Sequence, residues 1–213
     1  MPIPAPPGVI RTREDLLAQI HALGELEPVF RRIHDATDTP PLRLVPLSLE
    51  SLLSIITDQM LSRHAADAIW KRTRELLDPL TPQAVLATSE QSLRDVGQSR
   101  AKIRTFRAIA QAMLDRALDL DALDTQPDGR VIETLTQLPG VGDWTSHIVL
   151  LTCLGRADAF PAADVALQSA TQSAFGLDAR PSTKDLVHIA EAWRPHRATA
   201  ARLLWAYYRL HSN

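Results

Sequence analysis

The chain has 213 residues, with 23 basic and 25 acidic side chains, so its formal net charge at neutral pH is −2. This balance excludes a uniformly polybasic nucleic-acid binder and leaves only local basic patches as candidates. The single cysteine, Cys153, excludes an intramolecular disulfide and any zinc or iron–sulfur cluster held by several thiolates.

Hydrophobic residues recur with helical spacing through most of the chain, and no segment has a convincing strand pattern. In the first half, a serine or threonine marks each predicted helix start: Thr12, Ser48, Ser62, Thr81, Ser89 and Ser99. In the second half, helices are predicted at about 127–137, 143–154, 163–174, 183–193 and 195–210. We therefore predict an all-α fold, with loops at residues 1–8 and 35–46.

The first twenty residues contain no apolar run long enough for a signal peptide or a membrane span. We expect a soluble cytoplasmic protein with no membrane partner. Two stretches are basic without any acid: four basic residues from Arg100 to Arg107, and four arginines from Arg194 to the C-terminus. Solvated helix faces or binding patches would both explain such runs.

The segment Leu138-Pro-Gly-Val-Gly-Asp-Trp-Thr145 lies between two predicted helices. Gly140 and Gly142 favour a hairpin whose backbone amides converge at the positive end of the next helix, where a phosphate oxygen could bind. A simple turn in which glycine supplies a positive φ explains the same residues. A dinucleotide-binding loop is excluded, because no strand precedes the segment and the third glycine is missing.

About twenty residues later, Phe160-Pro-Ala-Ala-Asp164 places an aspartate at the start of a helix, where aspartates commonly act as caps. The two segments together resemble the helix-hairpin-helix and Gly/Pro-Asp signature of the DNA glycosylase superfamily. Within that superfamily, the chain resembles the alkylation-specific branch, 3-methyladenine DNA glycosylase II (AlkA-type). The residues that carry this resemblance are Trp144, Gln59-Met-Leu-Ser62, Ser99-Arg-Ala-Lys102, Trp193-Arg-Pro-His-Arg197 and Trp205. The similarity runs from about Ser48 to Leu210.

The resemblance implies two helical lobes with a cleft between them and a helix-hairpin-helix at about 128–154. Residues 1–47 would pack with the C-terminal lobe, 48–156 would form the lobe that contains the hairpin, and 157–213 would complete the second lobe. The implied activity is flipping and hydrolytic excision of alkylated bases, especially N-methylated purines, from double-stranded DNA. We expect a monomer that associates with the nucleoid when it is bound to DNA.

Asp164 is the candidate catalytic residue, since cleavage of a base from deoxyribose builds positive charge on the sugar that a carboxylate can stabilise. Trp144 stands where strand-cutting relatives carry a Schiff-base lysine, so the resemblance implies a monofunctional enzyme that leaves an abasic site. A tryptophan face also attracts cationic alkylated purines. Core packing is the alternative role for Trp144 and Trp205.

The other implied pocket residues are Gln59, Met60, Ile148, Val165 and Trp205. Ile148 and Val165 replace aromatic residues of well-known members, so we expect a pocket that is less aromatic.

The loop that contains Gln98, Ser99 and Arg100 is where the family places the residue that fills the gap left by a flipped base. An ordinary capped loop is the alternative. The implied DNA-binding residues are Gly140, Gly142, Thr145, Gln98, Ser99, Arg100 and Lys102. The resemblance further implies a Na⁺ or K⁺ ion held by the backbone carbonyls of Thr136, Leu138 and Val141, and no catalytic cofactor.

Two other functions remain open at this point. One is a non-catalytic helix-hairpin-helix protein that binds DNA, against which Asp164 and Trp144 argue. The other is a glycosylase for oxidised or mismatched bases, against which the missing lysine and the missing cluster cysteines argue.

Overall fold

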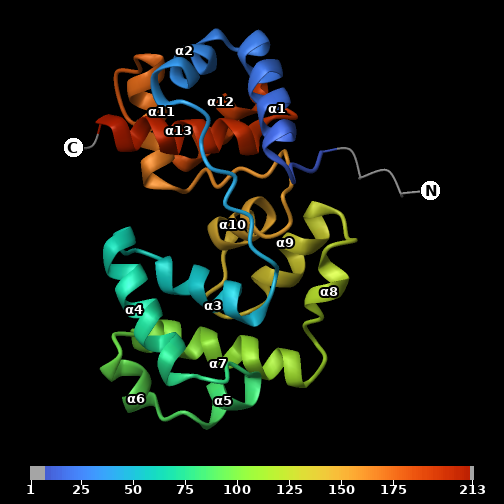
Figure 1. The fold of residues 1–213 in the computed structure, drawn as a ribbon, viewed down its shortest axis with the longest axis vertical. Coiled ribbons are helices and arrows are strands. Elements are labelled where there is room, and N and C mark those ends of the chain that lie inside the picture. The colour runs from blue at the N-terminus through green and yellow to red at the C-terminus, as the bar shows by residue number, and fades with distance from the viewer. Residues whose placement is uncertain (1–7, 212–213) are drawn as a thin grey trace. The chain divides into compact units, whose positions relative to one another are not determined.

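The computed structural model describes residues 8–211, and the predicted all-α fold is confirmed over this range (Figure 1). No β-strand forms among these residues, where a single antiparallel bridge joins Val9 and Arg156. The same range holds no helix that is both long and apolar enough to cross a membrane. Most of the predicted N-terminal loop, residues 1–7, lies outside the described residues.

Most helices follow one another with short connections, and longer ones join α2 to α3 and α10 to α11. In chain order they are α1 (Arg13–Leu26), α2 (Pro28–Thr37), α3 (Leu49–Asp58), α4 (Arg63–Leu76), α5 (Pro82–Ala87), α6 (Glu90–Asp95), α7 (Arg100–Leu114), α8 (Leu120–Leu123), α9 (Asp128–Thr136), α10 (Asp143–Thr152), α11 (Val165–Phe175), α12 (Thr183–Ala190), the 3₁₀ helix η1 (Glu191–Trp193) and α13 (Arg197–His211).

The chain divides into two compact units. Unit 1 consists of the residues up to Leu44 together with those from Leu150 onward, and unit 2 is the continuous stretch Val45–Val149. Helix α10 therefore contributes residues to both units. The boundaries predicted from the sequence, after residues 47 and 156, fall three and seven residues later than the structural ones.

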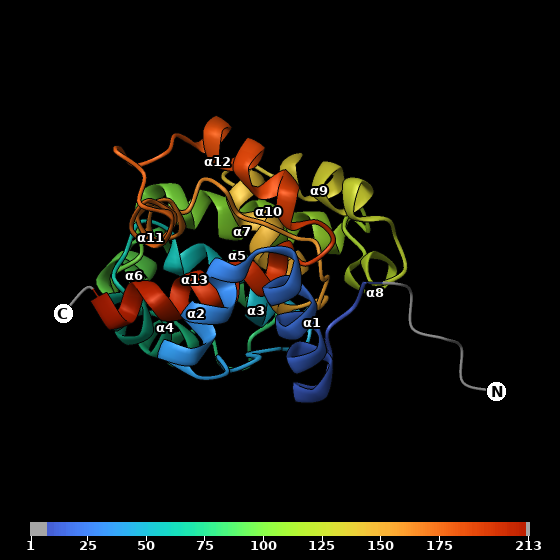
Figure 2. The ribbon, with the colours of Figure 1, turned by 90° about the horizontal axis from the view of Figure 1, so that it is seen from above.

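Unit 1 is built around α13, which contacts α1, α2 and α11 (Figures 1 and 2). An aromatic cluster forms its core: Trp193 contacts Phe30 edge-on, Phe160 edge-on and Phe175 in a stacked arrangement, with ring centroids 5.1, 5.6 and 5.5 Å apart. Such pairs add to the free energy of burying the rings. Residues far apart in the sequence thus share one hydrophobic core.

Unit 2 places α7 against α3, α5 and α6, while α4 packs on α3 (Figure 1). The apolar stripes of α3 and α7 supply its buried centre, including Leu53, Ile56, Ile103 and Phe106. Serine and threonine caps begin the helices where the sequence predicts them. Ser48, for example, accepts a hydrogen bond from Ser51 N at 3.2 Å.

Three predicted elements differ from the structure. The interval between the first two predicted helices contains the additional helix α2, whose first residue is Pro28. The stretch 183–193 divides into α12 and η1. Residues 153–164 are an irregular connection, because Gly155 takes a left-handed conformation with φ of 65° and Pro161 cannot continue a helical hydrogen-bond ladder.

Candidate active site and DNA-binding hairpin

The hairpin between α9 and α10 gives its two glycines different roles. Gly140 has φ of 82°, and a Cβ atom there would lie 2.0 Å from Thr105 Oγ1 on α7. A Cβ on Gly142 would meet no heavy atom within 4 Å. Only a glycine can therefore occupy position 140, whereas position 142 leaves open space at the N-terminus of α10. A helix N-terminus carries partial positive charge, so an anion is favoured there.

Gln59 fastens this hairpin to the end of α3. Its Nε2 donates to the Gly140 carbonyl at 3.1 Å and to Thr145 Oγ1 at 2.9 Å. Thr145 is only 2% exposed. The Thr145 side chain is therefore unavailable for the predicted DNA contact, because it lies inside unit 2 and its hydroxyl is bound to Gln59. Gln59 itself stabilises the hairpin, a role that the sequence did not indicate.

Met60 follows Gln59 in an unusual conformation. Its φ is 57°, in the left-handed region that non-glycine residues rarely occupy, and its side chain is 100% exposed. The predicted place of Met60 in a pocket wall stays a prediction. The backbone presents a long, flexible apolar side chain to the outside.

The loop before α7 and the first turn of that helix contain four predicted DNA contacts, two of which point inward. Gln98 is 3% exposed, and its Nε2 donates to Thr57 Oγ1 at 2.9 Å and to Thr73 Oγ1 at 3.0 Å. Lys102 Nζ donates to the Thr57 carbonyl at 2.7 Å. Burial lowers the pKa of Lys102, and the negative charge of Asp58 partly opposes this.

These positions correct two predictions. The buried Gln98 cannot fill a gap in DNA, and the Lys102 ammonium is bound to the last turn of α3, where a cation complements the helix dipole. Ser99 and Arg100 remain exposed candidates. Ser99 caps α7, and Arg100 pairs with Glu90 at 3.3 Å. The sequence gives no sign of the long-range partners of Gln98 and Lys102, which lie 25 to 45 residues away.

Asp164 is the N-cap of α11, and Trp205 lies beside it. Asp164 Oδ1 accepts hydrogen bonds from Leu167 N at 3.1 Å and from Trp205 Nε1 at 3.2 Å. Both residues are half-buried. The structure thus brings together two predicted site residues that are 41 positions apart, and it fixes one carboxylate oxygen by two N–H donors.

The remaining predicted pocket residues are divided between the units. Trp144 and Ile148 are half-buried on the part of α10 that belongs to unit 2. Val165, in unit 1 next to Asp164, is 56% exposed. All three side chains are at least partly exposed to solvent.

The carbonyls predicted to hold a monovalent cation belong to Thr136, Leu138 and Val141, all within one turn of unit 2. Oxygen donors suit a hard cation. The Leu138 carbonyl accepts a hydrogen bond from Val141 N at 3.0 Å, which uses one of its two lone pairs. The donor chemistry of this turn therefore fits the ion. Among the described residues, no group of three or more His, Cys, Asp or Glu side chains could hold a metal.

Comparisons with known proteins show which family the chain resembles. A model of the HhH-GPD superfamily of base excision DNA repair proteins matches residues 53–195. The chain is 26% identical over 188 residues to the alkylbase DNA glycosidase-like protein mag2 of Schizosaccharomyces pombe, a match that covers 86% of this chain and 87% of that protein.

Solved structures are similar as well. The 3-methyladenine DNA glycosylase (Mag1) of Schizosaccharomyces pombe in complex with abasic DNA has a TM-score of 0.83 at 25% identity, over 88% of this chain and 95% of that one. An 8-oxoguanine glycosylase/lyase of Clostridium acetobutylicum in complex with double-stranded DNA has a TM-score of 0.79 at 15% identity, over 95% of this chain and 72% of that one. This second likeness shows a shared fold.

Proposed function

Because the chain belongs to the HhH-GPD superfamily of base excision DNA repair proteins, we propose that it is a monofunctional DNA glycosylase that excises alkylated bases from double-stranded DNA. The names of mag2 and of Mag1 point to alkylated bases and to 3-methyladenine, and both matches cover most of this chain. The product would be an abasic site. Action as a monomer in the cytoplasm stays a prediction.

The observation that carries this proposal is the pair of hydrogen bonds to Asp164. Two N–H donors hold one carboxylate oxygen at the start of α11, so the orientation of the charged group is set before substrate binds. A preoriented carboxylate stabilises the positive charge that develops on the sugar as the bond to the base breaks. Asp164 therefore acts on the sugar, and Trp205 orients it.

Trp144 supports both the substrate class and the absence of strand cutting. An indole cannot form a Schiff base with the sugar, since that step needs an amine. Its ring attracts a cationic alkylated purine by about 0.5–2 kcal/mol through cation–π interaction. Cationic bases also leave more readily, so the protein needs to supply less stabilisation.

DNA binding is assigned to the hairpin and to Met60. The open space at Gly142 leaves room for a phosphate at the N-terminus of α10, and the first amides of a helix have no acceptor within that helix. Extruding a base leaves a gap in the stack, and an exposed apolar side chain can fill it. Met60 is fully exposed, whereas Gln98 is buried, so we assign this role to Met60.

The carbonyls of Thr136, Leu138 and Val141 would hold Na⁺ or K⁺ when DNA is bound. The ion would supply positive charge next to a phosphate at the hairpin. The chain's own contribution there is the rigid turn, which Gln59 ties to α3 through the Gly140 carbonyl.

The test is release of bases from methylated duplex DNA, compared with duplexes that contain uracil or 8-oxoguanine. We expect release of 3-methyladenine and 7-methylguanine, and a fall of about 10²-fold or more for Asp164→Asn. Asparagine caps helices as well as aspartate does, so α11 should persist in the variant. Asp119→Asn, which changes the cap of α8 in the same way, is the matched control.

Borohydride trapping separates the two reaction types. A Schiff base would be reduced to a stable adduct with DNA, and we expect none. Release of only uracil or 8-oxoguanine, or wild-type activity of Asp164→Asn, would refute the proposal.

A further inference from the structure

The irregular connection 153–164, which ends in the proposed catalytic residue Asp164, is held from several sides within unit 1. Outside a helix, its backbone polar groups need other partners. Ile10 N donates to the Gly155 carbonyl at 2.7 Å, and Ala198 N donates to the Ala157 carbonyl at 2.9 Å. The connection is thus hydrogen-bonded to the N-terminal part of the chain and to the start of α13.

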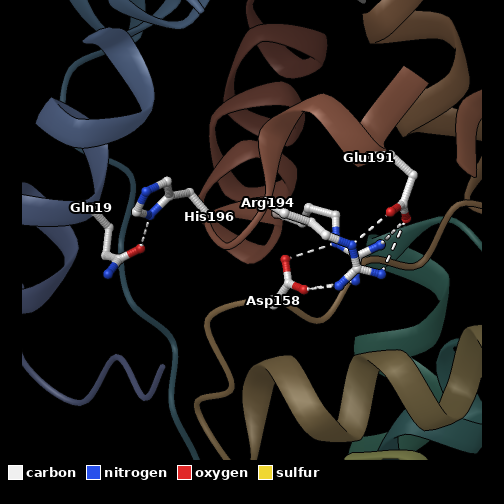
Figure 3. Close-up of polar contacts among 6 residues, drawn as sticks. Gln19, Asp158, Glu191, Arg194 and His196 are labelled. Carbon is white, nitrogen blue, oxygen red and sulfur yellow. Dashed lines mark hydrogen bonds and ion pairs between the residues drawn. The ribbon is translucent and has the colours of Figure 1, made fainter. Parts of the chain in front are cut away.

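Asp158 is the charged anchor of this connection (Figure 3). Arg197 Nε donates to Asp158 Oδ1 at 2.8 Å, and Arg197 Nη2 donates to Asp158 Oδ2 at 2.9 Å. The same guanidinium reaches Glu191 Oε1 at 3.1 Å, and Arg194 contacts both acids as well. The charges of two arginines and two acidic residues therefore neutralise one another at this point of unit 1.

The Arg197–Asp158 ion pair is two-pronged, as the Arg194–Glu191 pair is, and it is more buried than that pair. The Arg197 side chain is 12% exposed and pairs in a two-pronged manner, which strengthens the contact and fixes its direction. Arg31 and Glu25, an ion pair between α2 and α1, are both more than half exposed. Exposed pairs of that kind contribute little. The contact to Asp158 is therefore suited to positioning.

Between Asp158 and Asp164 two further contacts continue the path. Phe160 packs edge-on against Trp193, with ring planes at 79°. Gln168, which is buried, donates from Nε2 to the Ala162 carbonyl at 3.0 Å. These contacts restrict bond rotations between Asp158 and Asp164. A displacement of Asp158 is therefore transmitted to Asp164.

We propose that Arg197 is a positioning residue for base excision: by holding Asp158 with both prongs of its guanidinium, it sets where the Asp164 carboxylate stands. This inference rests on the proposed function of Asp164. Arg197 is also the first residue of α13, the helix that carries Trp205 two turns later. Arg197 therefore helps to position both residues of the hydrogen bond between Trp205 and Asp164. A displacement of about 1 Å at a reacting group can cost about 10²-fold in rate.

The experiment compares Arg197→Ala and Arg197→Lys with Arg31→Gln as the matched control. Lysine keeps the charge and the stem and loses the fork. We measure the single-turnover rate of base excision, the Kd for duplex DNA, and hydrogen exchange in the peptide that covers residues 158–165. Both Arg197 variants should excise about 10- to 100-fold more slowly with Kd changed less than twofold, and exchange should speed up in that peptide.

Added methylguanidinium should raise the excision rate of Arg197→Ala at least threefold. A general loss of folding would not allow such a rescue. Wild-type excision rates and unchanged exchange in folded Arg197→Lys would overturn the inference, as would a rate that falls only in proportion to the folded fraction. If the wild-type protein excises no base, the proposed function fails. The exchange measurement then decides separately whether Arg197 holds the connection.

Discussion

The two hairpin glycines allow a sharp test of how this protein holds DNA. Gly142→Ala adds a methyl group to open space, and no protein atom lies within 4 Å of it. Alanine is a poorer N-cap than glycine, while it reduces the freedom of the unfolded chain by about 0.4–1 kcal/mol. The two effects nearly cancel, so the free energy of unfolding should change by less than about 1 kcal/mol.

The same methyl group stands where a phosphate would approach the amides of α10. A hydrogen bond to a charged group contributes about 1.5–3 kcal/mol. Loss of one such bond corresponds to a rise in Kd of about 10- to 150-fold, since about 1.4 kcal/mol is tenfold. The variant should therefore be as stable as the wild type and bind DNA much more weakly.

The neighbouring glycines serve as controls. Gly129→Ala also meets no atom within 4 Å, but it lies in the first turn of α9, so it should be slightly stabilising and leave the Kd unchanged. Gly140→Ala combines φ of 82° with a contact of 2.0 Å to Thr105, and it should lower the unfolding temperature markedly.

The assay is fluorescence anisotropy with a duplex that contains an abasic-site analogue, at one fixed salt concentration, together with thermal unfolding. If Gly142→Ala binds this duplex as tightly as the wild type, the hairpin does not approach a phosphate there. Equal losses for Gly129→Ala would show that the effect is not specific to the hairpin.

Three further predictions follow from charge and exposure. The logarithm of the DNA affinity should fall with the logarithm of salt concentration at a slope that corresponds to about three to six phosphates, and a slope near zero would remove DNA as the partner. Met60→Ala should slow single-turnover excision from duplex DNA about tenfold and spare single-stranded substrate, whereas Leu61→Ala should do neither; equal effects on both substrates would contradict the gap-filling role. Burial lowers the pKa of His196, so below about pH 6.5 the unfolded chain binds more protons than the folded one and the free energy of unfolding falls. Urea titrations at several pH values should show that this free energy falls less steeply with acidification in His196→Gln. In the control His64→Gln, which changes an exposed histidine, it should fall as in the wild type.

The local signals in the sequence predicted the helices well. Thr12 and Ser48 each form a capping box at the start of a predicted helix, because these hydrogen bonds close within three residues. The start of α2 at Pro28 carried a usable signal, since proline is favoured at the first position of a helix. The predicted helices at 143–154 and 163–174 leave a connection between them, and in the structure this connection is longer by two residues at each end.

The basic stretch that begins at Arg194 shows that the exposed charge of a segment could not be predicted from its sequence either. Arg194 and Arg197 are paired with Asp158 and Glu191, and Arg202 is buried with its Nη2 bound to the Leu151 carbonyl at 3.0 Å. Burial lowers the pKa of Arg202 to about 10. A run of arginines without acids in the sequence is therefore largely neutralised or hidden in the fold, because its partners come from other parts of the chain.

The candidate site divides in a similar way. The pairing of Asp164 with Trp205 agrees with the residues that carry the family resemblance. The inward direction of Gln98, Lys102 and Thr145 could not be predicted, because each bonds to a residue at least 25 positions away. Polar side chains of this kind look the same in a sequence whether they face solvent or the interior.

The discontinuous make-up of unit 1 has a consequence for how the protein is made. Unit 2 is one continuous stretch, so it can fold as soon as Val149 has left the ribosome. Phe30 must wait for Trp193, and α1 and α2 must wait for α13, which is synthesised after the whole of unit 2. Chaperones would meet these two helices with their apolar faces uncovered until α13 emerges. The unit that carries Asp164 would therefore mature after unit 2.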